Sequence, residues 1–115
     1  MFQISSSELL RLAEGVRFDL GRVKRFSRPG YGGNRIYFDK FEIYWLKAEK
    51  GIRIESDFDL HEDTAEVCFV LSGHLVVIVG EQEVTVMEGM AVRFNALHEH
   101  RFDVVEDTVF LLIHH

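Results

Sequence analysis

The segment IRIESDFDLHEDTAEVCFVLSG, residues 52–73, contains two patterns that indicate the same class of structure. Between residues 52 and 60, the apolar positions 52, 54, 58 and 60 share one parity, and polar residues fill the others. From Glu66 to Leu71 the chain is almost continuously apolar, and Ser72-Gly73 ends the run. Since successive side chains of a β-strand point to opposite faces, the segment predicts two strands, at residues 52–61 and 66–71.

Similar short runs, rich in β-branched and aromatic residues, occur on both sides of this segment. They predict further strands at residues 35–38, 41–47, 75–79, 83–87, 91–94, 100–105 and 108–113. Turn-forming pairs such as Glu88-Gly89 and Glu106-Asp107 separate them. Many short strands with few helices are typical of a sandwich or barrel, so we expect an all-β fold.

The N-terminal part of the chain shows different patterns. Ser5 stands three residues before Glu8, as in a capping box, and Gly15 ends the apolar run that follows, which predicts one short helix. Residues 22–28 carry four basic side chains, and we expect a solvated loop or the edge of a sheet there. Residues 28–34, RPGYGGN, combine proline with three glycines and predict a loop.

The size and charge of the chain limit what it can do. A chain of 115 residues is long enough for one core, so we expect a single domain over residues 1–115. A net charge of −6 disfavours nucleic acid as a partner. No apolar run approaches the roughly 18 residues of a membrane span, and residues 1–12 lack the apolar core of a signal peptide. A single cysteine, Cys68, excludes an internal disulfide and fits a reducing, cytoplasmic compartment.

Four polar residues fall where strand parity brings them together. Asp59 and His61 share one face of their predicted strand, and Glu66 opens the next strand. His100 shares a face with Phe102 in a third strand, where an imidazole among apolar side chains needs a partner. Two imidazoles and one or two carboxylates from three strands form such a partnership around a divalent metal ion.

The same residues resemble the sequence motifs of the cupin family. Asp59-Leu60-His61, then Glu66 and Gly73, are similar to the first cupin motif, near residues 59–73. Residues 88–102, which end in His100-Arg101-Phe102, are similar to the second motif, near residues 89–102. The resemblance implies a jelly-roll-like β-barrel of two antiparallel sheets, here with one short N-terminal helix. It also implies a metal site inside the barrel.

Carried over residue by residue, the implied metal ligands are Asp59, His61, Glu66 and His100. The first histidine of the family motif is Asp59 in this chain, and the proline and glycine of the second motif are Asn95 and Leu97. Without Asp59 the set is two histidines and one carboxylate, as in non-haem Fe(II) sites; with Asp59 it has two nitrogens and two oxygens. Asp59 either ligates the metal or accepts a hydrogen bond from a ligand imidazole.

The ligand types favour Fe, Mn, Ni or Zn over Cu(I), and the metal itself is not identified. His98 is a spare imidazole that replaces a ligand only if its loop shifts. The terminal pair His114-His115 is assigned no function. Cys68 is expected to be a small buried residue rather than a nucleophile.

The resemblance leaves two functions open, and no catalytic residue is assigned. One is a metal-dependent enzyme that acts on a small oxygenated substrate such as a sugar, uronate or keto acid, of the isomerase or dioxygenase type. The other is a non-catalytic barrel that binds or senses a small molecule, with or without metal. Small cupins commonly form homodimers through their outer sheet faces, and residues 37–45 and Phe69 are candidates for that contact.

Overall fold

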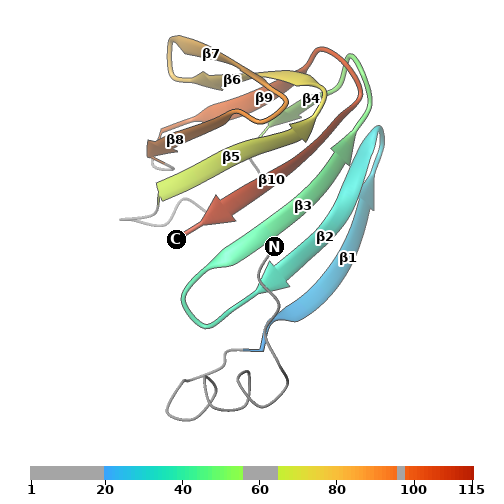
Figure 1. Ribbon diagram of the computed structural model, residues 1–115, viewed down its shortest axis with the longest axis vertical. Helices are drawn as coiled ribbons and strands as arrows, with labels where there is room; N and C mark the ends of the chain where they lie inside the picture. The colour runs from blue at the N-terminus through green and yellow to red at the C-terminus, as the bar shows by residue number, and fades with distance from the viewer. Residues whose placement is uncertain (1–19, 56–64, 96–97) are drawn as a thin grey trace, which may run out of the picture.

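A computed structural model describes residues 20–55, 65–95 and 98–115 of the chain (Figure 1). The strands in these residues are β1 (Arg22–Arg28), β2 (Tyr31–Tyr37), β3 (Glu42–Ala48), β4 (Arg53–Glu55), β5 (Ala65–Ser72), β6 (His74–Val79), β7 (Gln82–Met87), β8 (Ala91–Asn95), β9 (His100–Val104) and β10 (Thr108–His114). The all-β prediction is therefore confirmed. The helix predicted between Ser5 and Gly15 lies outside the described residues.

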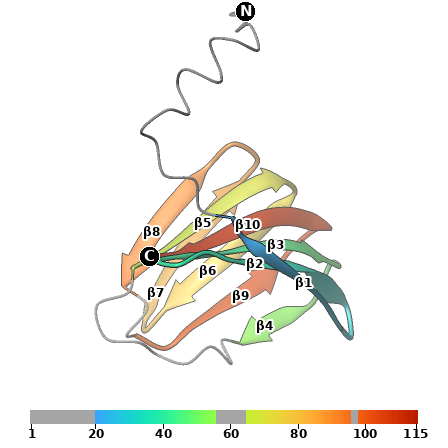
Figure 2. The same cartoon turned by 90° about the horizontal axis from the view of Figure 1, so that it is seen from below.

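The strands form two antiparallel sheets. The larger sheet has the order β1-β2-β3-β10-β5-β8, and the smaller has the order β4-β9-β6-β7. The two sheets face each other, and β1 and β2 continue the larger sheet on the side away from β7 (Figures 1 and 2). This is the jelly-roll-like arrangement of two antiparallel sheets that the motif resemblance implied. The described residues form no helix with the length and apolar character that a membrane crossing requires.

The core lies between the inner faces of the two sheets. In β5 the burial alternates, with Glu66, Cys68 and Val70 fully buried, which confirms the parity read from the sequence. The largest fully buried side chains are Phe102 from the smaller sheet and Phe110 from the larger, whose ring centroids are 5.9 Å apart. Burying each of them stabilises the fold by about 2–3 kcal/mol.

The loop predicted for residues 28–34 is wrong. The chain turns at Pro29-Gly30 alone, and β2 begins at Tyr31, so that Gly32 and Gly33 lie within the β1–β2 hairpin. A side chain at Gly33 would collide with the main-chain carbonyl of Trp45 on β3, and one at Gly32 would press on the main chain of β1. These glycines therefore allow neighbouring strands to approach closely. In the sequence, glycines with this role look the same as glycines that form a turn.

The prediction for residues 22–28 is confirmed, because β1 is the outermost strand of the larger sheet. The strand predicted at residues 52–61 is described only as far as Glu55. Within β4, Ile54 is buried and its neighbours on either side are exposed, as expected from the alternation. Asp59 and His61 lie outside the described residues.

The turn between β5 and β6 connects the two sheets, and Gly73 occupies it with φ +101°. A Cβ atom at this position would meet the Asp107 carbonyl and the side chain of Thr108. Thr108 is itself fixed, because its hydroxyl accepts a hydrogen bond from the main-chain N–H of His74 at 3.0 Å and lies 2.6 Å from the carbonyl of Glu106. Gly73 is thus required for two reasons: the backbone has a positive φ, and there is no room for a Cβ atom.

We expect Gly73→Ala to lower the free energy of unfolding by about 3 kcal/mol, since it adds about 1 kcal/mol of backbone strain and a further clash. Gly51 is a matched control, because its φ is +86° and nothing lies within 4 Å of an added Cβ. Gly51→Ala should cost only about 1 kcal/mol. Urea unfolding of both variants measures the difference, and equal losses would show that the clash at Gly73 is absent.

Candidate metal centre

Three polar side chains meet inside the barrel at one end of the core. Glu66 lies near the start of β5 and His114 at the end of β10, and the two residues are directly paired across the larger sheet. His100 starts β9 and reaches the same point from the smaller sheet. The alternation in β9 and β10 directs both histidines inward, since Phe102 and Leu112 on the same faces are fully buried.

Glu66 contacts both histidines, one through each carboxylate oxygen. Its Oε1 lies 2.9 Å from His114 Nε2, and its Oε2 lies 2.8 Å from His100 Nε2. The Glu66 side chain has no exposed surface, and the side chain of His100 is 1% exposed. Inside a protein such a carboxylate is costly unless other groups balance its charge, so the two histidines are required for Glu66 to be buried.

The charges of this cluster depend on one another. Burial alone would raise the pKa of Glu66, but the contacts with His100 and His114 outweigh it and hold the pKa below its usual value. Burial would lower the pKa of His100, but the contact with Glu66 and the hydrogen bond to the His98 carbonyl together raise it. The cluster therefore favours a charged carboxylate with positive charge beside it.

The two ring nitrogens of His100 have different partners. Nδ1 lies 2.8 Å from the carbonyl oxygen of His98, so it carries a proton and donates a hydrogen bond to it. In neutral His100 the Nε2 atom then has a lone pair that faces Glu66 Oε2. These two buried atoms are close, yet neither has an aligned hydrogen-bond partner in the described part of the protein.

This arrangement fits a cation between or beside the two atoms. Two lone-pair atoms at 2.8 Å repel each other unless a proton or a metal ion balances them. Ligand atoms that bind one ion at about 2.1 Å, at a right angle, lie about 3 Å apart, close to the observed separation. Glu66 Oε2 and His100 Nε2 are thus suited to adjacent positions on a divalent metal ion.

The structure brings together two of the four ligands predicted from the sequence. Glu66 and His100 meet as expected, whereas Asp59 and His61 lie outside the described residues. Within residues 20–55, 65–95 and 98–115, no group of three histidine, cysteine or acidic side chains has the geometry of a metal site. His98 is exposed, and its main-chain carbonyl, not its imidazole, contributes to the cluster.

His114 is the site residue that sequence reasoning missed. The sequence alone assigns no function to the pair His114-His115. The signal that identifies it is parity, since Thr108, Phe110, Leu112 and His114 share one face of β10. Its ring donates to Glu66 Oε1 or accepts from it according to its tautomer, and only donation is compatible with an ionised carboxylate.

The prediction for Cys68 is confirmed. Its side chain is fully buried, and burial, together with the nearby charge of Glu66, raises the pKa of the thiol to about 12. A thiol with so high a pKa is almost wholly protonated at neutral pH, so Cys68 is a packing residue rather than a nucleophile.

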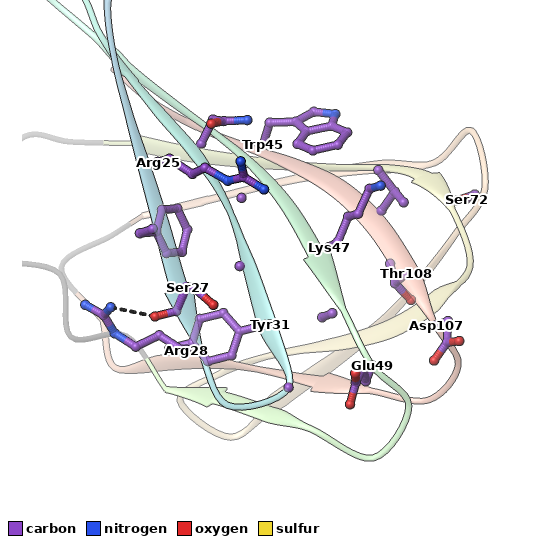
Figure 3. Close-up of a pocket in the computed structure, with 17 residues that line it drawn as sticks. Arg25, Ser27, Arg28, Tyr31, Trp45, Lys47, Glu49, Ser72, Asp107 and Thr108 are labelled. Carbon is purple, nitrogen blue, oxygen red and sulfur yellow. Dashed lines mark hydrogen bonds between the residues drawn. The ribbon is translucent and has the colours of Figure 1, made fainter.

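Two hollows lie near the larger sheet. One, of about 230 Å³, lies on the inner side of β1 and β2, and Tyr44 forms part of its wall. The ring of Tyr44 also packs against the ring of His114, with 5.3 Å between centroids, so the hollow adjoins the Glu66 cluster. The other, of about 940 Å³, is an open groove along β2 where Gly30, Gly32 and Gly33 have no side chains (Figure 3). Its wall includes Arg25, Trp45 and Lys47, and Glu66, His100 and His114 do not line it.

Comparisons with known proteins agree with this fold. The sequence model of a family described as "Cupin domain" matches residues 49–114. KdgF from Halomonas sp. superposes with a TM-score of 0.67 at 15% identity, over 79% of this chain and 84% of that chain. Ectoine synthase from P. lautus gives 0.64 at 10% identity, over 78% and 67%. The cupin domain of an XRE family transcriptional regulator from Enterobacter cloacae gives 0.61 at 23% identity, over 83% and 95%.

No curated protein matches the chain. The three solved structures named above are each less than 25% identical to it, so their likeness shows the fold and does not transfer an activity.

The pKa directions predict how stability depends on pH when metal is removed with a chelator. The raised pKa of His100 gives stability that is fully present below its usual value of 6.5 and is lost as the pH rises through the folded-state pKa. The lowered pKa of Glu66 gives stability that is present above its usual value of 4.5 and is lost as the pH falls through the folded-state pKa. The cluster should therefore contribute most between about pH 4.5 and 6.5.

Urea unfolding from pH 4 to pH 9 measures this profile, with Glu66→Gln as the control. The neutral amide keeps the shape of the side chain and removes its charge. The difference in free energy of unfolding between the two proteins should therefore decline at alkaline pH, where His100 loses its proton. A constant difference across that range would contradict the assigned charges.

Proposed function

Given that the chain belongs to the cupin domain family, we propose that Glu66 and His100, together with His61 and Asp59, hold a divalent metal ion that acts on a small oxygenated ligand. The observation that carries this proposal is the contact between Glu66 Oε2 and His100 Nε2. Both atoms are buried, they are 2.8 Å apart, and neither has an aligned hydrogen-bond partner among the described residues. A metal ion would satisfy both atoms at once.

The neighbouring residues would hold these two ligands in place. The His98 carbonyl fixes the His100 ring through Nδ1, which leaves Nε2 available for a metal. His114 holds Glu66 Oε1, so that Oε2 is directed toward His100. Such partners orient metal ligands and increase their basicity, and their loss typically weakens metal binding by 10- to 100-fold, an order-of-magnitude figure.

A bound divalent ion would supply Lewis acidity, polarising a carbonyl or hydroxyl oxygen of a bound substrate. The surrounding residues would exclude water, since the core side chains next to the cluster, Phe102 and Leu112, are fully buried. A sugar, uronate or keto acid is the class of substrate proposed, with isomerase or dioxygenase chemistry. A hollow lies next to the cluster, with Tyr44 between them, and offers a small molecule a place to bind, which supports a role of this end of the barrel in small-molecule binding.

A second candidate is a barrel that binds a small molecule without turnover. The same fold occurs within a regulator, since 95% of the cupin domain of the Enterobacter cloacae transcriptional regulator superposes on this chain. Turnover distinguishes the two candidates, whereas metal binding is compatible with both. The fold itself is consistent with binding of a small molecule in either case.

We expect His100→Ala and His61→Ala each to remove most of the bound metal, because each deletes a proposed ligand. Elemental analysis by mass spectrometry, on protein purified without a nickel column, measures the metal content. Thermal stability should fall as well, since an ion present at 100 times its dissociation constant stabilises the native state by about 2.7 kcal/mol. Asp59→Ala should weaken retention if Asp59 ligates the metal or orients a ligand.

His74→Ala is the matched control, because His74 lies at the opposite end of β6 from Val79, the residue paired with His100. Metal content near wild type in the His74 variant and near zero in the His61 and His100 variants supports the assignment. Equal metal content in all three variants would overturn it.

We also propose that the outer face of the larger sheet pairs with a second copy of the chain. Apolar side chains cover it over three adjacent strands: Ile43, Trp45, Val67, Phe69, Leu111 and Ile113. Their neighbours on the inner face are buried in the core, so these side chains point outward. An apolar patch of this extent is typical of a protein–protein contact.

Leu111→Glu should convert a dimer to a monomer, because it places a charge between Trp45 and Phe69, its two cross-strand neighbours. Val84→Glu, on β7 of the other sheet, is the control and should leave the mass unchanged. Light scattering after gel filtration measures the mass against 13.4 kDa for one chain. A wild-type protein that is monomeric at high concentration would refute the pairing.

A further inference from the structure

We propose that the hollow enclosed by β1, β2, β3 and β4 binds a small carboxylate that carries an aromatic ring. Among the described residues its lining consists of Lys24, Phe26, Arg28, Tyr31, Arg35, Tyr37, Tyr44, Ile54 and Glu55. Binding in the hollow is independent of the function proposed above, because none of these nine residues is a proposed metal ligand.

The hollow is a consequence of the unequal sheets. The larger sheet has six strands and the smaller has four, and β4, the strand at its edge, is described over three residues only. The strands β1 and β2 therefore extend past the smaller sheet (Figure 1). The space left over has a volume of about 230 Å³, which suits a single ring with a short substituent.

Basic side chains give the hollow its preference for an anion. Lys24 and Arg28 project from the inner face of β1, as shown by their pairing with Arg35 and Tyr31 of β2. Neither forms an ion pair with an acidic side chain among the described residues, whereas Arg35 is held by Glu42 at 2.9 Å. Glu55 is the acidic residue of the described lining. Counted together with Glu42, which pairs with Arg35, the described residues around the hollow carry three positive and two negative charges.

The Arg35 guanidinium is fixed in place, and its charge is already paired with that of Glu42. It lies 4.4 Å from the ring centroid of Tyr37 and 5.1 Å from that of Tyr44, so it is held between two aromatic rings and Glu42. Its Nε is buried and has no hydrogen-bond partner among the described residues. A ligand oxygen would satisfy this donor, and the burial cost of leaving it unsatisfied would then be recovered on binding.

Aromatic side chains give the preference for a flat ring. Phe26, Tyr31, Tyr37 and Tyr44 all line the hollow, and Phe26 and Tyr44 already pack edge to face with 6.3 Å between centroids. A further aromatic ring would extend this packing by stacking or edge contacts, which are worth more than burial of the same area alone. A carboxylate on that ring would face the basic residues of β1.

Tyr44 connects the hollow to the metal centre. Its ring is 5.3 Å from the ring of His114, whose Nε2 contacts Glu66. Burial, only partly offset by Arg35, raises the pKa of Tyr44 well above its usual value, so its hydroxyl stays protonated. A ligand in the hollow would thus lie one aromatic ring away from the Glu66 cluster.

The test is binding of phenylacetate to the purified full chain, measured by calorimetry and by NMR shift perturbation. The neutral amide phenylacetamide and the non-planar acid cyclohexylacetate are the matched probes. We expect phenylacetate to bind roughly tenfold more tightly than the amide, since a hydrogen bond to a charged acceptor is stronger than one to a neutral acceptor. It should also bind more tightly than cyclohexylacetate. Inorganic phosphate should not compete at the same concentration.

Two variants on one strand localise the binding. Arg28→Ala should weaken phenylacetate binding several-fold, whereas Arg25→Ala should not, because Arg25 lies on the opposite face of β1. Equal affinity for acid and amide, competition by phosphate, or equal effects of the two variants would each overturn the proposal.

The same titration on the His100→Ala variant separates this proposal from the metal site. Binding retained in that variant, with its metal lost, supports the hollow as an independent site. Loss of phenylacetate binding together with the metal would show that the anion binds the ion and would overturn the hollow as its binding site.

Discussion

A buried carboxylate held between two imidazoles is the interaction on which the site depends. Glu66 has no exposed surface, and it is stable there because His114 contacts one oxygen and His100 contacts the other. His114 comes from the same sheet as Glu66 and His100 from the opposite sheet. The contact therefore joins the two layers of the barrel at a polar point within an apolar core. Burial lowers the pKa of His100, and Glu66 together with the His98 carbonyl raises it, so the chemistry of the site and the packing of the sheets are linked.

Much of the fold follows from patterns in the sequence. Alternation in the strand containing Glu66, Cys68 and Val70 identified the buried face, and Gly73 marked the turn that connects the sheets. The sequence signal failed at Gly32 and Gly33. There glycine accommodates the close approach of neighbouring strands, and only knowledge of which strands are neighbours distinguishes that role from a turn.

The site was predictable to the extent that it depends on local spacing. Glu66 and His100 were found because strand parity and the cupin motifs agree on them. His114 was not found, because its role depends on the register between β10 and β5, which pairs it directly with Glu66. Register is set by the assembled sheet and is not expressed in any short motif. The basic and aromatic hollow was missed for the same reason, since its residues come from four strands.

The most direct test of the metal centre is crystallography of the protein soaked in Mn²⁺, with data collected to record anomalous scattering from the metal. An anomalous peak within about 2.3 Å of both Glu66 Oε2 and His100 Nε2 is the predicted result. His114 should remain bonded to Glu66 Oε1 in that structure. A direct contact between Glu66 and His100 that persists at saturating Mn²⁺, with no peak beside either atom, would contradict the account, since the two residues would then be only a buried ion pair.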